Sequence, residues 1–195
     1  MRVNGQRKTI ALDIGGVCVK LRHPEMFRFF GWQDNAPSGF MEMADLMEVG
    51  EMSDDEWLAA FNRFTDRRFS REEIIRGWNI VIGEPMDGMT EFLMSLKKAG
   101  FRLIFFSDTS RIHVTEIFRT PDISSLTDGA VYSFEAGAKK PSPAMFRLFE
   151  ERYGTPVLYL DDKPENIEGG IRHGWRSHRF TGFANLEKML ADNPL

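Results

Sequence analysis

The sequence contains a single cysteine, Cys18, among its 195 residues. One cysteine cannot form an internal disulfide, and it does not combine with the four histidines into a set that resembles a structural zinc site. We therefore expect neither a disulfide scaffold nor a zinc module. A reducing cytoplasm is the simplest location for such a chain.

Long apolar runs and an excess of positive charge are also missing. No apolar stretch approaches the ~20 residues that a membrane helix needs, and the run near the N-terminus is interrupted by Asp13. The 25 Lys and Arg residues are outnumbered by 29 Asp and Glu residues, which gives a net charge of -4. Binding to nucleic acid needs a concentrated basic face. The sequence therefore predicts a soluble protein that binds neither membranes nor nucleic acid.

The remaining composition and its patterning indicate one globular α/β domain with an insertion. Hydrophobic residues make up 42% of the sequence, which is too apolar for a disordered chain. Short runs typical of strands buried in a parallel sheet occupy residues 9–12, 101–106, 130–134 and 157–160. Helical segments punctuated by proline or glycine lie between them, at residues 89–99, 143–152 and 164–173. This alternation predicts a Rossmann-like, doubly wound parallel sheet.

Residues 21–85 break the alternation and are predicted to form helices only. Ser53 with Glu56, and Ser70 with Glu73, fit the capping box, in which side chains and backbone amides satisfy each other at a helix start. Further helices are predicted at residues 24–30 and 38–49. A helical insertion directly after the first strand is expected to cap the carboxyl edge of the sheet. We therefore predict a helical cap of residues 21–85 on a core made of residues 1–20 and 86–195.

The first predicted strand runs into Asp13, followed by Gly15 and Gly16. Ligands bind at the carboxyl ends of the strands in open parallel sheets, so Asp13 is well placed for a reacting carboxylate. The two glycines allow the backbone to approach a ligand closely and expose amide groups to an anion. By itself, an aspartate at a strand end is more often a turn or cap residue.

The next two strands bring a hydroxyl group and a cation to the same edge. Ser107 and the Asp108 amide could hold a phosphoryl oxygen, although this segment could instead cap the helix that follows Ser110. Lys140 follows the third strand. A lone lysine there is usually exposed to solvent, so each signal is weak when taken alone.

The last predicted strand ends in two adjacent carboxylates, Asp161 and Asp162. Adjacent carboxylates repel each other, so such a pair usually needs a cation or a set of donors. Asp162 with Asn166 could support Mg²⁺, a hard ion that prefers oxygen ligands. The alternative is that Asp162 caps the helix that begins at Pro164. The agreement of four strand ends in order and placement is stronger than any single signal.

These four strand ends resemble motifs one to four of the haloacid dehalogenase superfamily, and they read ALDIGGV, FFSDT, KKPSP and LYLDDKPEN. The resemblance spans essentially the whole chain, including the insertion as a small cap. More narrowly, the chain resembles the branch that contains bacterial sugar-phosphate phosphatases, especially those acting on α-glucose 1-phosphate, and the N-terminal domain of soluble epoxide hydrolases. The segments that carry this narrower resemblance are GEMSDDEW, SDTSRIH and DDKPENIEGG. The motifs are specific for the superfamily and much less specific for the substrate.

The resemblance implies a Mg²⁺-dependent phosphatase acting on a small phosphorylated metabolite. Asp13 would attack phosphorus and form an aspartyl phosphate. Mg²⁺ would be held by Asp13, the Gly15 carbonyl and Asp162, with Asn166 in support. The implied grip on the phosphoryl oxygens comes from Ser107, the Asp108 amide and Lys140, which also orients Asp13. Lys140 is chosen over its neighbour because the family's lysine directly precedes the proline.

Gly15 departs from the pattern of the superfamily, in which most phosphatases have a second aspartate two residues after the nucleophile. That aspartate protonates the leaving group, and losing such help typically costs about 10² to 10⁴ in rate. Either the substrate has an easily expelled leaving group, such as an anomeric sugar phosphate or an acyl phosphate, or another residue supplies the proton. The candidates are His23 near the cap and Glu51 within it.

Two other functions accommodate the same residues. A catalytically impaired module could bind a phosphorylated ligand or a protein partner, and Gly15 is the only support for it. Dehalogenase chemistry also uses an aspartate nucleophile but needs no metal, so the pair formed by Asp161 and Asp162 argues against it. The sequence favours an active, selective phosphatase.

Overall fold

A computed structural model of the chain describes residues 2–3, 6–33, 35–119 and 121–195. Its centre is a five-stranded sheet in which every neighbouring pair is parallel. The strands stand in the order β7 (Gly129–Tyr132), β6 (Arg102–Ser107), β3 (Thr9–Leu12), β8 (Leu158–Asp161) and β9 (Ser177–Arg179). Because β3 pairs with both β6 and β8, the strand order changes direction at the centre of the sheet. The predicted α/β class is confirmed.

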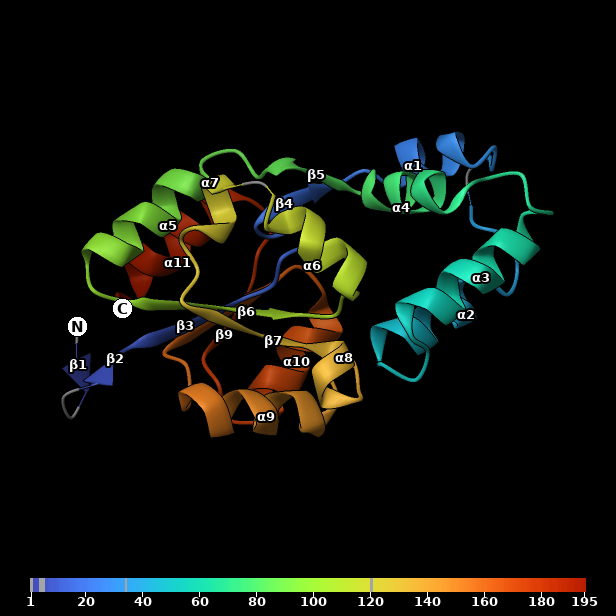
Figure 1. Cartoon of the computed structure of the whole chain (residues 1–195). Coiled ribbons are helices and arrows are strands. Elements are labelled where there is room, and N and C mark those ends of the chain that lie inside the picture. The colour runs from blue at the N-terminus through green and yellow to red at the C-terminus, as the bar shows by residue number, and fades with distance from the viewer. Residues whose placement is uncertain (1, 4–5, 34, 120) are drawn as a thin grey trace.

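Successive residues of the central strands point to opposite faces, and each face has its own apolar core. In β6, Leu103 belongs to one core and Ile104 to the other. Figure 1 shows helices on both sides of the sheet. The first face packs against α5 (Met89–Lys98), α6 (Arg111–Ile117), α7 (Pro121–Ser124) and α11 (Phe183–Asp192). The second packs against α9 (Pro143–Tyr153) and α10 (Pro164–Arg172). Burial on both faces explains why the strands are almost continuously apolar.

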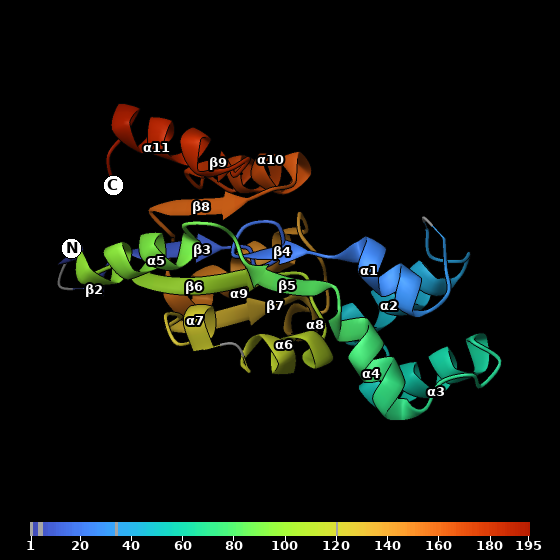
Figure 2. The ribbon, with the colours of Figure 1, turned by 90° about the horizontal axis from the view of Figure 1, so that it is seen from above.

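A helical insertion leaves the core after β4 (Val19–Leu21) and returns through β5 (Ile82–Pro85), which pairs with β4 in antiparallel fashion. It consists of α1 (His23–Phe29), α2 (Phe40–Glu48), α3 (Asp54–Phe64) and α4 (Arg71–Asn79). Both predicted capping boxes are present, at Ser53 and Ser70. Figures 1 and 2 place these helices beyond one end of the sheet, opposite the chain termini. The insertion buries an aromatic-rich apolar cluster of its own.

The structure corrects several expected boundaries. Residues 21–85 are not helical throughout, because β4 and β5 occupy the two edges of that range. The predicted strand at 130–134 ends at Tyr132, and Ser133 already begins the short helix α8 (Ser133–Ala136). The edge strand β9 and the helix α11 were not predicted. Strand β9 reads Ser-His-Arg, so it lacks the apolar run by which buried strands are found.

The strands β1 (Arg2–Val3) and β2 (Gln6–Arg7) form a small antiparallel pair before the central sheet. Among the described residues, no helix has both the length and the apolar character needed to cross a membrane.

Candidate active site

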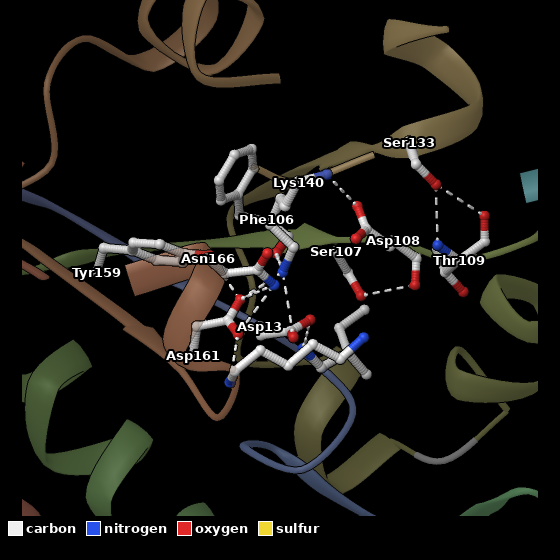
Figure 3. A network of polar contacts seen from close by, with 12 residues as sticks. Asp13, Phe106, Ser107, Asp108, Thr109, Ser133, Lys140, Tyr159, Asp161 and Asn166 are labelled. Atoms are coloured by element: carbon white, nitrogen blue, oxygen red, sulfur yellow. Dashed lines mark hydrogen bonds and ion pairs between the residues drawn. The ribbon is translucent and has the colours of Figure 1, made fainter. Parts of the chain in front are cut away.

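The carboxyl ends of β3, β6 and β8 meet where the strand order changes direction, which is the usual ligand site of open α/β sheets. Asp13 directly follows β3, Ser107 is the last residue of β6, and Asp161 is the last residue of β8. The loop between α8 and α9 adds Lys140. Figure 3 shows these side chains, which come from four separate parts of the sequence, converging on one point.

Lys140 lies at the centre of this group. Its Nζ atom lies 3.1 Å from Asp13 Oδ2 and 2.7 Å from Asp161 Oδ2, and it donates a 2.8 Å hydrogen bond to the Phe106 carbonyl. Burial alone would lower the pKa of Lys140, but the nearby carboxylates outweigh it and raise that pKa well above its usual value. Lys140 is therefore a buried cation, and the solvent-exposed alternative for this residue is wrong.

Asp13 is held from two sides. The Ile14 amide donates a 2.7 Å hydrogen bond to Oδ1, while Oδ2 pairs with Lys140. Burial raises the pKa of Asp13 above its usual value, and Lys140 only partly offsets this effect. The carboxylate is thus fixed in orientation and poorly solvated, which is the condition in which a nearby cation stabilises it most.

Asp161 has protein donors on both carboxylate oxygens. Oδ2 accepts from the Tyr159 hydroxyl at 2.5 Å, and Oδ1 accepts from the Lys163 amide at 2.9 Å. Asn166 Nδ2 donates to both oxygens, at 3.1 and 3.2 Å. Burial would raise the pKa of Asp161, but Lys140 and these hydrogen bonds outweigh it and lower the pKa. Asp161 therefore anchors Lys140, a role that the sequence analysis did not identify.

Asp162 differs sharply from its neighbour. Its Oδ1 atom is buried and has no hydrogen-bond partner in the structure. Asp13, Asp161 and Asp162 each offer a carboxylate oxygen, and the three oxygens lie within 4.8 Å of one another. An oxygen-rich site with an orphaned buried carboxylate oxygen fits a hard cation such as Mg²⁺. The amide of Asn166 contacts Asp161, so its observed contribution to such a site is indirect.

The glycines after Asp13 allow this close packing. Gly16 has a φ of +73°, and a Cβ atom there would lie 2.6 Å from Asp162 Oδ2. Only glycine fits this position without displacing the carboxylate. Gly15 is less constrained, since a Cβ atom would meet the Leu21 side chain at 3.1 Å. Gly15 lines the same cavity as Asp13 and Asp162.

The loop after β6 is held by hydrogen bonds to the Lys140 backbone and to the Ser133 side chain at the start of α8. Asp108 Oδ1 accepts from the Lys140 amide at 2.9 Å, so the carboxylate of Asp108 fixes the lysine loop. Thr109 donates its amide to Ser133 Oγ at 3.0 Å. Ser107 is buried beside them and lines the cavity. This loop is therefore held in place next to Asp13.

The alternative capping roles go to other residues. Ser110 itself caps α6, because its Oγ accepts from the His113 amide at 3.2 Å. The N-cap position of α10 is Lys163, whose amide is bound by Asp161. Ser107, Asp108 and Asp162 are therefore not needed as helix caps. Their side chains or amides can serve a ligand.

A cavity of about 290 Å³ lies between this cluster and the helical insertion. Its polar end contains Asp13, Gly15, Ser107, Asp108 and Asp162. The opposite wall comes mainly from α1, α2 and α4. His23, one of the two expected alternative proton donors, lines the cavity, whereas Glu51 is exposed and is not part of its lining.

A family model described as haloacid dehalogenase-like hydrolase matches residues 7–174. The chain belongs to the haloacid dehalogenase-like hydrolases. A haloacid dehalogenase (HAD) family enzyme from Bacteroides thetaiotaomicron, BT-2542, superimposes with a TM-score of 0.77 at 18% identity, over 89% of this chain and 93% of that one. A HAD-like family hydrolase from Porphyromonas gingivalis has a TM-score of 0.77 at 20% identity, over 94% and 98%. At these identities the neighbours show the shared fold.

A further structure of the Bacteroides enzyme was solved with magnesium and inorganic phosphate bound to that protein. It has a TM-score of 0.75 at 19% identity and covers 89% of this chain and 93% of that one. The fold of this hydrolase therefore occurs in a protein that binds both groups.

Proposed function

We propose that this hydrolase is a Mg²⁺-dependent phosphatase of small phosphomonoesters. The observation that carries the proposal is that the three neighbouring carboxylates differ in their partners. Lys140 pairs with Asp13 and Asp161, whereas the neighbouring Asp162 has a buried oxygen without a partner. This arrangement offers a fixed carboxylate nucleophile, a fixed cation and an open cation site within a few ångströms of each other.

In the proposed reaction an Asp13 carboxylate oxygen attacks phosphorus and the bond to the leaving oxygen breaks, so that an aspartyl phosphate forms. Water then attacks the same phosphorus, the bond to Asp13 breaks, and the carboxylate and inorganic phosphate are released. Phosphoryl transfer depends mainly on positioning and on neutralising charge. Lys140 would provide a positive charge, and Asp161 would keep its Nζ in place.

Ser107 and the Asp108 amide are proposed to hold the phosphoryl oxygens. Both belong to the loop that contacts with Lys140 and Ser133 hold against the core. Donors that are fixed before the substrate arrives stabilise the transition state without a reorganisation cost. The loop would then have a function beyond connecting β6 to α6.

The Asp13 and Asp162 carboxylates and the Gly15 carbonyl are the residues proposed to hold Mg²⁺. When bound, the ion would offset the repulsion between the carboxylate nucleophile and the phosphate. The unpartnered Asp162 oxygen supports this assignment, as do the magnesium and phosphate bound to the Bacteroides enzyme. We propose the same cofactor for this chain.

We further propose that residues 21–85 act as a cap that limits access of water to Asp13. The cavity between the insertion and the sheet edge supports this role. His23 lies in that cavity, but burial and the charge of Lys163 lower its pKa. Its imidazole is therefore neutral near pH 7 and is a weak candidate for replacing the acid absent at Gly15.

The proposal is tested by incubating the purified protein with Mg²⁺ and a panel of phosphomonoesters that includes sugar phosphates and acyl phosphates, and by measuring released phosphate. Asp13→Asn and addition of a chelator are the controls, and both should abolish turnover. Turnover that survives Asp13→Asn would contradict the aspartyl phosphate. Binding of phosphomonoesters without any turnover would support the impaired binding module instead.

A further inference from the structure

The cavity in front of Asp13 has two chemically different halves. The half at the sheet edge contains the carboxylates of Asp13 and Asp162 and the loop of Ser107 and Asp108 that we propose to hold phosphate. The other half is built by the insertion and β4. A substrate whose phosphorus lies at Asp13 must place its leaving group in that second half. The side chains there therefore select the leaving group.

This second half is mainly apolar. Its wall is formed by Leu21, Phe27, Phe40, Met41, Ala44 and Trp78. Leu21 is 40% exposed and Met41 is 56% exposed, and both side chains line the cavity. An apolar leaving group in this half would remove carbon surface from water, which is favourable. A polyhydroxylated group would gain nothing from it.

Three polar side chains of this wall, those of Lys139, Glu48 and His113, already have partners within the protein. Lys139 pairs with Asp45 and, at 2.6 Å, with Glu48. His113 Nε2 contacts the Trp78 carbonyl at 3.2 Å, and its ring stacks on that of Trp78. The hydroxyl groups of a sugar would have to compete with these contacts. A site that selects hydroxyl groups needs buried polar groups that the ligand satisfies.

The cavity is also small. Its volume of about 290 Å³ lies at the lower limit of the range of about 300–1,000 Å³ for ligand pockets. After the phosphoryl group is accommodated, the remaining space suits a leaving group of about one ring. Flat rings would pack against the aromatic side chains of Phe40 and Trp78.

The environment of Gly15 restricts the leaving group further. Gly15 has no acid to protonate the departing oxygen, and the Leu21 methyl groups lie where a Cβ atom at this position would make contact, at 3.1 Å. On the Gly15 side of the cavity, the leaving oxygen therefore meets the carbon atoms of Leu21 and not a carboxylic acid. A weakly basic oxygen, such as that of a phenol, can leave as an anion without help, whereas an alcohol oxygen cannot do so readily.

We propose that the preferred substrates are small aryl phosphomonoesters with a single aromatic ring, and this inference rests on the phosphatase function proposed above. An Asp13 oxygen bonds to phosphorus, the bond from phosphorus to the phenolic oxygen breaks, and its electron pair leaves with the phenolate. The phenolate takes its proton from solvent. Water then releases phosphate from Asp13, as described above.

The test compares kcat/KM for phenyl phosphate, cyclohexyl phosphate, α-glucose 1-phosphate, acetyl phosphate and a phosphotyrosyl peptide, with Mg²⁺ present. We expect phenyl phosphate to exceed both cyclohexyl phosphate and α-glucose 1-phosphate by at least about tenfold. Equal or faster turnover of the sugar phosphate would overturn the inference while leaving the phosphatase proposal intact. Faster turnover of the peptide would replace the small-molecule substrate by a phosphoprotein. Absence of turnover on the whole panel would instead defeat the phosphatase proposal itself.

A series of ring-substituted phenyl phosphates tests the missing acid. Without a proton donor, kcat/KM should rise steeply as the phenol becomes more acidic. A flat dependence would show that a protein group protonates the leaving oxygen, and would overturn that part of the argument.

Matched methionine variants test the wall. Met41→Gln places a polar amide at the cavity, and Met94→Gln makes the same change on α5, where Met94 is 43% exposed and does not line the cavity. We expect Met41→Gln to lower the ratio of phenyl phosphate to acetyl phosphate kcat/KM by about three- to tenfold. Met94→Gln should leave the ratio unchanged. Equal ratios in the two variants would show that this wall does not select the leaving group.

Discussion

The sheet edge and the helical insertion face the same cavity but are built from opposite materials. At the sheet edge, buried charges such as Lys140 and Asp161 are fixed by short directional contacts. In the insertion, rings pack on rings, as in the pairs Phe30–Phe61 and Trp57–Trp78, whose centroids are 4.7 and 5.0 Å apart. Directional contacts fix where a reaction occurs, because a buried charge without its partner is very costly. Apolar packing tolerates changes of shape more readily. The difference underlies our proposal that the sheet edge performs the chemistry and the insertion selects the leaving group.

The largest expected effect separates the two regions most clearly. Asp13→Asn should lower kcat by about 10⁴-fold or more, because the amide is a poor nucleophile, while the fold is kept. Released phosphate and the circular dichroism spectrum measure the two properties. A matched change in the insertion, Asp55→Asn on exposed α3, should alter neither. Comparable losses of activity in both variants would contradict the division.

Lys140→Met should destabilise the protein by about 3–5 kcal/mol, because it leaves the buried carboxylates of Asp13 and Asp161 without their cation. Urea unfolding at pH 7 provides the measurement. Lys97→Met removes the more exposed pair with Asp128 and should cost about 1 kcal/mol or less. Similar costs in the two variants would show that burial of the Lys140 cluster has no energetic weight.

The contact between the regions should depend on pH through His113, a buried residue of α6 whose ring stacks on that of Trp78. Burial lowers the pKa of His113 from 6.5 to about 4, although the Trp78 carbonyl partly opposes the shift. The folded state thus binds this proton less readily than the unfolded state. The stability contributed by the neutral ring is present above pH 6.5 and is lost as the pH falls toward about 4.

His113→Gln tests this pH dependence. Between pH 6.5 and 4, the loss of unfolding free energy should be smaller in the variant, by up to about 1.4 kcal/mol per pH unit, because glutamine does not titrate. Urea unfolding at several pH values measures this difference, since the other titrating groups are common to both proteins. Identical pH dependence of wild type and His113→Gln would contradict the assignment.

Gly15→Asp should restore the acid at the boundary between the regions, provided that Leu21 yields space. The double change Gly15→Asp with Leu21→Ala is therefore expected to raise kcat/KM for cyclohexyl phosphate by about tenfold, with little change for phenyl phosphate. The Leu21→Ala single variant is the control. A fall in activity on both substrates in the double variant would show that the loop rejects any side chain at this position.

Lys139→Gln should have the smallest effect, because its pairs with Asp45 and Glu48 join the regions through partly exposed side chains. We expect a loss of about 1 kcal/mol or less, and a melting temperature lower by about 2–4 °C at most. Lys20→Gln breaks pairs within the β4–β5 region and serves as the comparison. A loss as large as that of Lys140→Met would mean that this pair holds the insertion in place.

The sequence was most informative where local rules decide the structure. Four of the five strands of the central sheet, the helices α5, α9 and α10, and the capping boxes at Ser53 and Ser70 follow from periodicity and punctuation. The edge strand β9 did not, because its stability comes from pairing with β8 and not from its own apolar character. The last helix, α11, begins at Gly182 without a capping side chain, so its start carries no local signal.

The residues predicted for the candidate site lie together in the structure, but the contacts between them were not predicted. Strand ends identified Asp13, Lys140 and Asp162, yet the distinct duties of Asp161 and Asp162 depend on which oxygen meets a donor in three dimensions. The same holds for the Asp108 side chain, which binds the Lys140 amide across 32 residues of sequence. Contacts of this range leave no periodic trace in the chain.

The adjacent glycines after Asp13 have unequal freedom to change. A side chain at Gly16 would meet the Asp162 carboxylate at 2.6 Å, on a backbone that disfavours any other residue. At Gly15 the obstacle is only the flexible end of Leu21. Random variation across this loop would thus be filtered unevenly, because position 16 accepts only glycine whereas position 15 accepts a side chain if Leu21 moves. Variants that add an acid to this loop are therefore expected at residue 15 and not at residue 16.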